Sequence, residues 1–407
     1  MYDPPPAGVP PGRGPGEPMY FCKNCLNPST RPNIHIDEEG VCLACRYHEQ
    51  RRAGAIDWGA RREELVKLAA WGKANTKCSY DCIVPISGGK DSLRQSLYVR
   101  DELGLKPLLV SCVYPPEQIT ERGAYNLANL ISLGFDTISV HLDPRVWKIL
   151  MLQAFIQFAN WCKSTELALY SIPIHVAIAY KIPLLFLGEN PAYTIGERES
   201  SLDGDATMMK YSNTVGGGNP DHLLTDGVSW RDLHFYRYPS DDEMQWAKLR
   251  IAYLGYHIED FNSEKNAEVA KANGLWVRDD ETPEEIGDIR GHFCLDEDFS
   301  IMNQMIKQVK LGFGRVMDQV CEAIHLGEMD REEAIRIVKL YDGKCHPRYV
   351  QRFCDYLGIS TEYFWEIVEA YRNKNVWEKN AAGDWALKFD FHRTRDDATP
   401  EELGGKS

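Results

Sequence analysis

The sequence has no long hydrophobic run. None of its apolar stretches approaches the ~20 residues that a membrane-spanning helix needs, so we expect no membrane partner. The first 18 residues hold seven prolines and four glycines and no apolar segment, which is not the pattern of a secretory signal peptide. Because such a composition cannot build a core, we expect residues 1–18 to be a disordered tail, and we expect a cytoplasmic protein.

Positive charge is also scarce. Lys and Arg number 46 against 60 Asp and Glu, which gives a formal net charge of −14. A protein that binds along a nucleic-acid backbone needs a positive surface, so we do not expect a nucleic-acid partner.

Cysteine, by contrast, is abundant. Twelve cysteines without an export signal indicate reduced thiols or metal ligands rather than disulfides. Four of them form two CxxC pairs with 16 residues between the pairs: Cys22, Cys25, Cys42 and Cys45. This spacing is typical of a zinc ribbon or knuckle, in which each turn presents two thiolates to Zn²⁺. Four thiolates leave no open coordination position, so we predict a structural zinc ion; the alternative is four unrelated buried cysteines.

Strand and helix patterns alternate between residues 81 and 188. We expect strands at Asp81–Ile86, Pro107–Val113, Thr137–Leu142 and Ile182–Gly188. We expect helices at Ile56–Ala74, Asp91–Leu103, Thr120–Leu133 and Pro144–Tyr180, the last one broken near Pro173. This alternation predicts an α/β fold with a doubly wound parallel sheet, in which ligands bind beyond the carboxyl ends of the strands.

The C-terminal third is predicted to be helical. Phe299–His325 has apolar residues at helical spacing with Gly312 and Gly314 inside it, and Asp330 predicts the start of a further helix. The chain is thus predicted to consist of a disordered tail 1–18, a zinc-ribbon-like module 19–50, a linker helix 51–78, a nucleotide-binding domain 79–260, a helical substrate or partner region 261–390 and a tail 391–407.

A short glycine-rich turn follows the first predicted strand of the sheet: Ser87-Gly88-Gly89-Lys90-Asp91-Ser92. It is too short for a Walker A loop. Its glycines let backbone N–H groups face an anion, and the N-terminus of the next helix adds partial positive charge. Lys90 can neutralise pyrophosphate, the serines can donate hydrogen bonds, and Asp91 can cap the helix or help to hold Mg²⁺.

This SGGKDS turn, between a strand and a helix, resembles the signature of the PP-loop, or N-type, ATP pyrophosphatases. The resemblance implies that residues 79–260 form a PP-loop domain with ATP and Mg²⁺ as cofactors. It also implies that ATP is cut between its α- and β-phosphates, that AMP is placed on a carbonyl oxygen, and that a nitrogen or sulfur nucleophile then displaces AMP.

Sulfur is one possible nucleophile. The chain resembles some tRNA-thiolating PP-loop enzymes in the order of its zinc module and its loop. Those enzymes add a second CxxC in the helical stretch after the third strand, whereas this chain has Cys162-Lys163-Ser164-Thr165 there. One thiol remains where two are needed, so we expect Cys162 to be a buried structural residue. A sulfurtransferase acting on tRNA or on a small molecule stays an alternative.

A more specific resemblance extends from about Tyr20 to about Lys388. It is carried by "RPNIHIDEEGVCLACR", the SGGKDS loop, "IPLLFLGENP", "KLGFGRVMD", "REEAIRIVKLYDGK", "CDYLGIS..YFWEIV" and "NVWEKN..GDWALK". In these motifs the chain resembles the N-acetyl sugar amidotransferases of surface-polysaccharide and nonulosonic-acid biosynthesis. The resemblance implies an enzyme that converts the acetamido group of a sugar or sugar nucleotide into an acetamidino group, using ATP and ammonia.

The candidate site residues follow from the loop, the strand ends and this resemblance. We expect pyrophosphate, Mg²⁺, adenine and ribose to be bound by Ser87, Gly88, Gly89, Lys90, Asp91, Ser92, Ser111, Cys112, Val113 and Gly188. We expect Lys90, Asp91 and Glu189 to be catalytic, with Glu189 as a Mg²⁺ ligand or as the proton acceptor for ammonia. The candidates for substrate binding are Asn190, Arg198, Lys310 and Arg315, for which the alternative is a structural ion pair.

The source of ammonia is predicted to be another protein. A glutaminase needs an activated cysteine, and neither Gly-x-Cys-x-Gly nor a cysteine directly after Met1 occurs in the sequence. We therefore expect a separate glutaminase subunit, with or without a cyclase-like subunit. A non-catalytic nucleotide-binding scaffold is a further alternative, but a degenerate module would be expected to lose Lys90 or Asp91 first.

Overall fold

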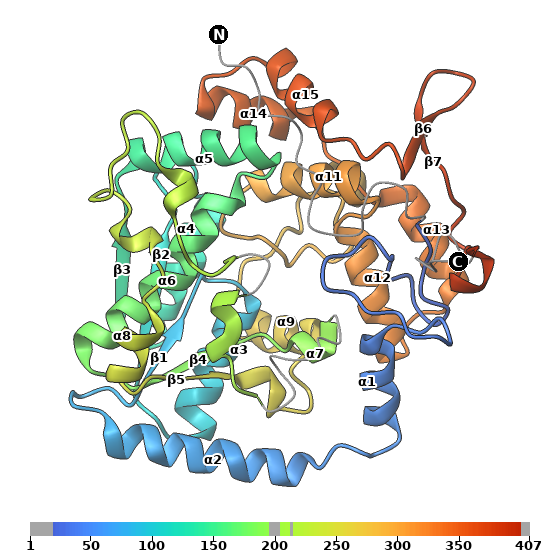
Figure 1. Ribbon diagram of the computed structural model, residues 1–407. Helices are drawn as coiled ribbons and strands as arrows, with labels where there is room; N and C mark the ends of the chain where they lie inside the picture. Colours follow the sequence, from blue (N-terminus) through green and yellow to red (C-terminus); the bar gives the residue numbers. More distant parts are fainter. Residues whose placement is uncertain (1–18, 195–203, 212–214, 400–407) are drawn as a thin grey trace.

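The structure is a computed structural model that describes residues 19–194, 204–211 and 215–399. Five parallel strands form one sheet in the order β3-β2-β1-β4-β5 (Figure 1). The strands are β1 (Cys82–Pro85), β2 (Pro107–Val113), β3 (Thr137–His141), β4 (Leu184–Leu187) and β5 (Arg250–Tyr253). The predicted α/β fold with a parallel sheet is confirmed. The strand order reverses between β1 and β4, which is where doubly wound sheets bind their ligands.

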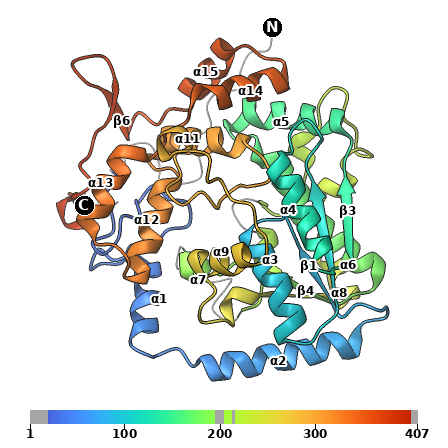
Figure 2. The same cartoon turned by 180° about the vertical axis from the view of Figure 1, so that it is seen from behind.

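Each of the two sheet faces has its own hydrophobic core, because side chains alternate along a strand. Leu185 and Leu187 of β4 point into one core, and Leu184 and Phe186 point into the other. The first face is covered by α5 (Pro144–Phe158) and α6 (Cys162–Tyr180). The second face is covered by α2 (Trp58–Asn75), α3 (Lys90–Leu97), α4 (Glu121–Ser132) and α9 (Ser263–Ala272). Figure 2 shows α3 and α4 from this side.

The predicted helix break near Pro173 is wrong. Helix α6 continues through Pro173, and the chain breaks between α5 and α6 instead. Ala159, at φ 42°, ends α5, and the side chain of Asn160 accepts a hydrogen bond from the backbone N–H of Cys162 at 3.0 Å. These two residues supply the local end and start signals, so the single proline interrupts the helical hydrogen bonding without ending the helix.

The predicted helix Phe299–His325 is two helices, α11 (Phe299–Leu311) and α12 (Arg315–Leu326). Gly312 takes a left-handed φ of 81° at the end of α11. The carboxylate of Asp342 accepts hydrogen bonds from the backbone N–H groups of Gly314, at 2.7 Å, and Met317, at 3.1 Å. A carboxylate distant in sequence therefore caps α12, and the two glycines form the turn rather than part of a helix.

The predicted zinc-ribbon-like module, residues 19–50, which we call the metal module, shares its core with other parts of the chain. Tyr20, Phe21 and the four paired cysteines share one core with Val316 of α12 and Phe391 near the C-terminal end of the described chain. The backbone N–H of Phe21 donates to the carbonyl of Arg393 at 2.9 Å, so the start of the predicted tail 391–407 contacts the module. Residues 1–18, the other predicted tail, lie outside the described residues.

The remaining elements are short helices, C-terminal helices and one hairpin. They are α1 (Leu43–Arg52), α7 (Pro191–Thr194), α8 (Asp241–Trp246), α10 (Pro283–Ile286), α13 (Arg331–Tyr341), α14 (Pro347–Leu357), α15 (Thr361–Ala370), β6 (Trp377–Lys379) and β7 (Trp385–Leu387). Strand β5 and this hairpin were not predicted from the sequence. None of the helices in the described ranges is both long enough and apolar enough to cross a membrane.

Candidate functional site

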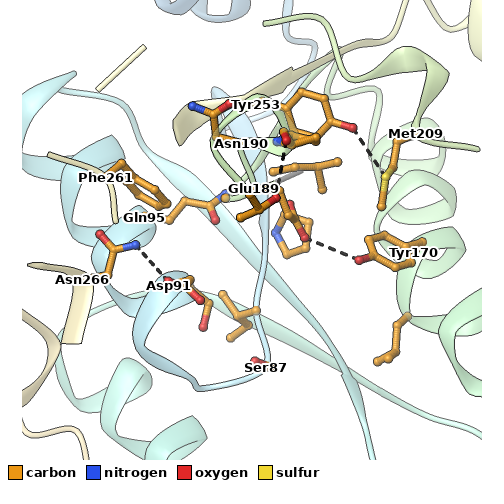
Figure 3. A pocket seen from close by; sticks show the side chains of 18 of the residues that line it. Ser87, Asp91, Gln95, Tyr170, Glu189, Asn190, Met209, Tyr253, Phe261 and Asn266 are labelled. Atoms are coloured by element: carbon orange, nitrogen blue, oxygen red, sulfur yellow. Dashed lines mark hydrogen bonds between the residues drawn. The ribbon is translucent and has the colours of Figure 1, made fainter. Parts of the chain in front are cut away.

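A cavity of about 680 Å³ lies at the carboxyl edge of the sheet, where the strand order reverses. Its wall includes the turn after β1, the segment after β4 and the end of β2, as the general rule for such sheets predicts. The predicted site residues that line it are Ser87, Lys90, Asp91, Ser92, Cys112, Gly188, Glu189 and Asn190. Ser87, Asp91, Glu189 and Asn190 are labelled in Figure 3. The predicted residues that do not line it are Gly88, Gly89, Ser111, Val113, Lys310 and Arg315, and Arg198 lies outside the described residues.

The turn Ser87–Ser92 is fixed from two sides. Gly88 has φ 88°, and a Cβ atom there would lie 3.1 Å from the backbone nitrogen of Leu127 in α4, so this position requires glycine. In α3, the side-chain amide of Gln95 donates to the carbonyl of Phe186 in β4 at 2.5 Å. The turn is therefore held in a defined position between α4 and β4.

Lys90 and Asp91 form an ion pair in the cavity wall, in which Lys90 is buried and the side chain of Asp91 is half-exposed. Lys90 is 4% exposed, and its Nζ lies 2.7 Å from Asp91 Oδ2 and 4.1 Å from the ring centroid of Phe293. The other Asp91 oxygen accepts from Asn266 Nδ2 at 2.9 Å. Burial works to raise the pKa of Asp91, but the charge of Lys90 and these hydrogen bonds outweigh it, so the net pKa is lowered. Asp91 is thus an ionised carboxylate in the site.

Two further carboxylates of the wall are protonated more easily than usual. Burial, together with the negative charge of Asp91, raises the pKa of Glu189, to whose carboxylate the Tyr170 hydroxyl donates at 3.5 Å (Figure 3). Burial raises the pKa of Glu166 to about 7, although Lys163 opposes the shift. With a pKa of about 7, Glu166 can take up or release a proton near neutral pH.

Glu166 was missed by the sequence reasoning, which singled out Cys162 on the same helix. Cys162 does not line the cavity, and its sulfur accepts from the side-chain amide of Asn303 at 3.4 Å. Glu166 and Tyr170 follow Cys162 at intervals of four residues and do line the cavity. The helical period was the available signal, because it places these residues one above another on a face of α6.

The charged side chains of the cavity wall are mostly acidic. Among the described lining residues, the carboxylates of Asp91, Glu166, Glu189 and Glu322 accompany one cation, Lys90. A further anionic group in this space would be repelled unless a cation entered with it.

Lys310 and Arg315 make contacts elsewhere. The Lys310 ammonium donates to the carbonyl of Phe158, the last residue of α5, and burial with the nearby Lys163 lowers its pKa to about 8. The Arg315 guanidinium donates to Cys294 Sγ at 3.2 Å and lies 4.9 Å from the ring centroid of Phe293. These contacts anchor the C-terminal helices and give neither residue a place in the cavity wall.

The four paired cysteines form a compact cluster that could bind a metal ion such as zinc. Their sulfur atoms all lie within 4.8 Å of one another and are buried. Cys22 and Cys45 are 3.8 Å apart and Cys25 and Cys42 are 3.7 Å apart. Zn–S bonds of about 2.3 Å in a tetrahedron place the sulfurs about 3.8 Å apart, so the cluster fits zinc.

Residues 292–392 match the family model for the C-terminal domain of WbpG-like LPS biosynthesis proteins. The match supports a family of polysaccharide biosynthesis. It begins at His292, next to Phe293 of the cavity wall, and it does not reach the Ser87–Ser92 turn. No curated protein matches the sequence.

The cysteine cluster leads to a first prediction. Purified protein should contain one zinc ion per chain by elemental analysis, and Cys42→Ser should lose it. The variant should also be destabilised, because metal-binding energy is folding energy in small metal sites. Cys345→Ser, which changes a cysteine outside the cluster, should keep the metal. Full zinc content in Cys42→Ser would contradict the assignment.

A second prediction follows from Glu166. Its folded-state pKa of about 7 lies above the ordinary value of 4.5, so the stability that its protonated form contributes is complete below pH 4.5 and is lost as the pH rises through 7. Glu166→Gln is neutral at every pH. It should therefore unfold like the wild type near pH 4.5 and be about 1–3 kcal/mol more stable at pH 8, since one pKa unit corresponds to about 1.4 kcal/mol.

Urea denaturation at both pH values measures this difference. Glu63→Gln, a matched change on the exposed face of α2, should give the same stability as the wild type at both values. An equal effect of Glu166→Gln at the two pH values would contradict the burial of an ionisable carboxyl group at this position.

Proposed function

We propose that this protein is an ATP-dependent amidotransferase of polysaccharide biosynthesis. In the proposed reaction it adenylates the acetamido oxygen of a sugar or sugar nucleotide, and ammonia then displaces AMP to give an amidine. One observation carries the proposal: the Ser87–Ser92 turn and Glu189, at two neighbouring strand ends, face the same cavity. The match of residues 292–392 to WbpG-like proteins supports the polysaccharide pathway.

ATP is proposed to bind with its phosphates on the turn and its adenosine along the end of β2. Lys90, Ser87 and Ser92 would hold the departing pyrophosphate, and Cys112 would contact the nucleoside. Asp91 and Glu189 fit Mg²⁺, because hard cations prefer carboxylate oxygens and Asp91 stays ionised. When bound, Mg²⁺ would supply the positive charge that this acidic wall lacks for a polyphosphate.

The proposed chemistry has two steps. The amide oxygen of the acceptor attacks the α-phosphate of ATP, and the bond to the β-phosphate breaks as pyrophosphate leaves. Ammonia then attacks the activated carbon, the C–O bond to AMP breaks, and the nitrogen loses a proton. Glu166, whose pKa of about 7 is near the working pH, or Glu189, whose pKa is raised, accepts that proton.

The cavity favours nitrogen over sulfur as the nucleophile. Among the described lining residues, Cys112 is the one cysteine, and burial raises the pKa of its thiol to about 12. A thiol that stays protonated is a poor carrier of sulfur. The acidic wall also disfavours tRNA, which is a polyanion, and suits a neutral acetamido group.

Ammonia is proposed to come from a separate glutaminase subunit, with or without a cyclase-like subunit. No cysteine in the sequence lies in a glutaminase nucleophile motif, and none of the described lining cysteines is activated. We propose that the reaction takes place in the cytoplasm, because ATP and sugar nucleotides are available there.

The test is the release of pyrophosphate and AMP from ATP with UDP-N-acetylglucosamine and an ammonium salt. Lys90→Met should lower the rate roughly 100-fold or more, because it removes the cation that stabilises the departing pyrophosphate. The methionine keeps an apolar stem against Phe293, so the fold should persist by circular dichroism. Lys73→Met, on the exposed face of α2, is the matched control. Formation of ADP instead of AMP, or a wild-type rate in Lys90→Met, would contradict the proposal.

A further inference from the structure

Two residues of the metal module line the cavity. Pro32 and Asn33 lie in the segment between the two CxxC pairs, far from the Ser87–Ser92 turn in sequence, and both are part of the cavity wall. Glu322 of α12 also lines the cavity. The cavity is thus bounded by the sheet on one side and by the shared core of the metal module and α12 on the other.

The Pro32–Asn33 turn is held in place by contacts of the two residues that precede it. The Thr30 hydroxyl donates to the carbonyl of Leu311 at 2.5 Å. The Arg31 guanidinium pairs with Asp318 of α12 and lies 4.8 Å from the ring centroid of Phe313. Asn33 then takes a left-handed φ of 63°, which reverses the chain at the cavity. The turn is therefore a preorganised part of the wall.

The cysteine cluster fixes the ends of the same segment. Cys25 precedes it and Cys42 follows it, and their sulfurs are 3.7 Å apart. A second connection runs from Cys45 Sγ to His325 Nε2 at 3.3 Å, and His325 stacks on His48 with ring centroids 4.4 Å apart. His48 Nε2 donates to the carbonyl of Tyr193, another lining residue, at 3.1 Å. Two routes thus join the cluster to the cavity wall.

We propose that the Pro32–Asn33 turn is an acceptor-binding element, in which the Asn33 amide contacts the hydroxyl or acetamido groups of the sugar. The identity of the acceptor rests on the proposed function. In the proposed function the Ser87–Ser92 turn and Cys112 bind the nucleotide, whereas Asn33 belongs to the metal module, whose core is shared with α12 and not with the sheet. A neutral amide offers both a donor and an acceptor, which suits a sugar and not a phosphate in a wall with four carboxylates.

Binding measurements test this without turnover. Zinc-loaded full-length protein is titrated with α,β-methylene-ATP and, separately, with UDP-N-acetylglucosamine in the presence of that analogue. Asn33→Gly removes the amide and keeps the backbone, because glycine adopts a positive φ without strain. The affinity of this variant for the ATP analogue should stay within about twofold of that of the wild type. Its affinity for the sugar nucleotide should fall at least about 5-fold, which corresponds to the loss of roughly one hydrogen bond. Glu38→Gln, an exposed change in the same segment, should alter neither affinity.

The outcomes separate this inference from the proposed function. Wild-type affinity for the sugar nucleotide in Asn33→Gly overturns the inference, and so does an equal loss of affinity for both ligands. If the wild type binds the sugar nucleotide but forms no AMP from ATP with that sugar nucleotide and an ammonium salt, the proposed reaction is overturned and the acceptor contact stands. If the wild type does not bind the sugar nucleotide, the acceptor assignment is overturned in the proposed function and in this inference.

Discussion

The site depends on the reversal of strand order between β1 and β4. The segments that follow β1 and β4 leave the sheet toward opposite faces, and the cavity lies between them at the carboxyl ends of the strands. The Ser87–Ser92 turn keeps its place there because Gly88 fits closely against α4 and Gln95 ties α3 to β4. A loss of either contact would move Lys90 and Asp91 relative to Glu189, on which the proposed chemistry relies.

The proposed chemistry depends, second, on the charges of the residues that line the cavity. Four carboxylates line the same space as the buried Lys90, and the pKa shifts of Asp91, Glu166 and Glu189 differ in direction. Asp91 stays ionised beside Lys90 and Asn266, whereas burial raises the pKa of both Glu166 and Glu189. The same cavity therefore holds one carboxylate that stays charged and two carboxyl groups whose protonated form is favoured.

Much of the sheet could be predicted from the sequence. Strand β2 was predicted with the observed bounds, because its apolar run is flanked by clear turn signals, and the cysteine spacing predicted the cluster. The errors concern features that depend on distant partners. The separation of α11 from α12 depends on the carboxylate of Asp342, which caps α12. The position of Glu166 in the cavity wall depends on which face of α6 is turned toward the cavity. Pro32 and Asn33 reach the cavity because the metal module packs on α12, and local sequence carries no signal of that packing.

The most direct test of the account is the choice of nucleophile. The isolated protein is incubated with ATP, UDP-N-acetylglucosamine and one donor at a time: an ammonium salt, glutamine or sulfide. Mass spectrometry identifies the sugar product, and AMP is measured in parallel. The account predicts an amidine with ammonium, in amounts that match AMP and rise with pH, because only NH₃ has a free lone pair. It predicts no product with glutamine until a glutaminase is added. A thioamide formed with sulfide, and no amidine with ammonium, would contradict it.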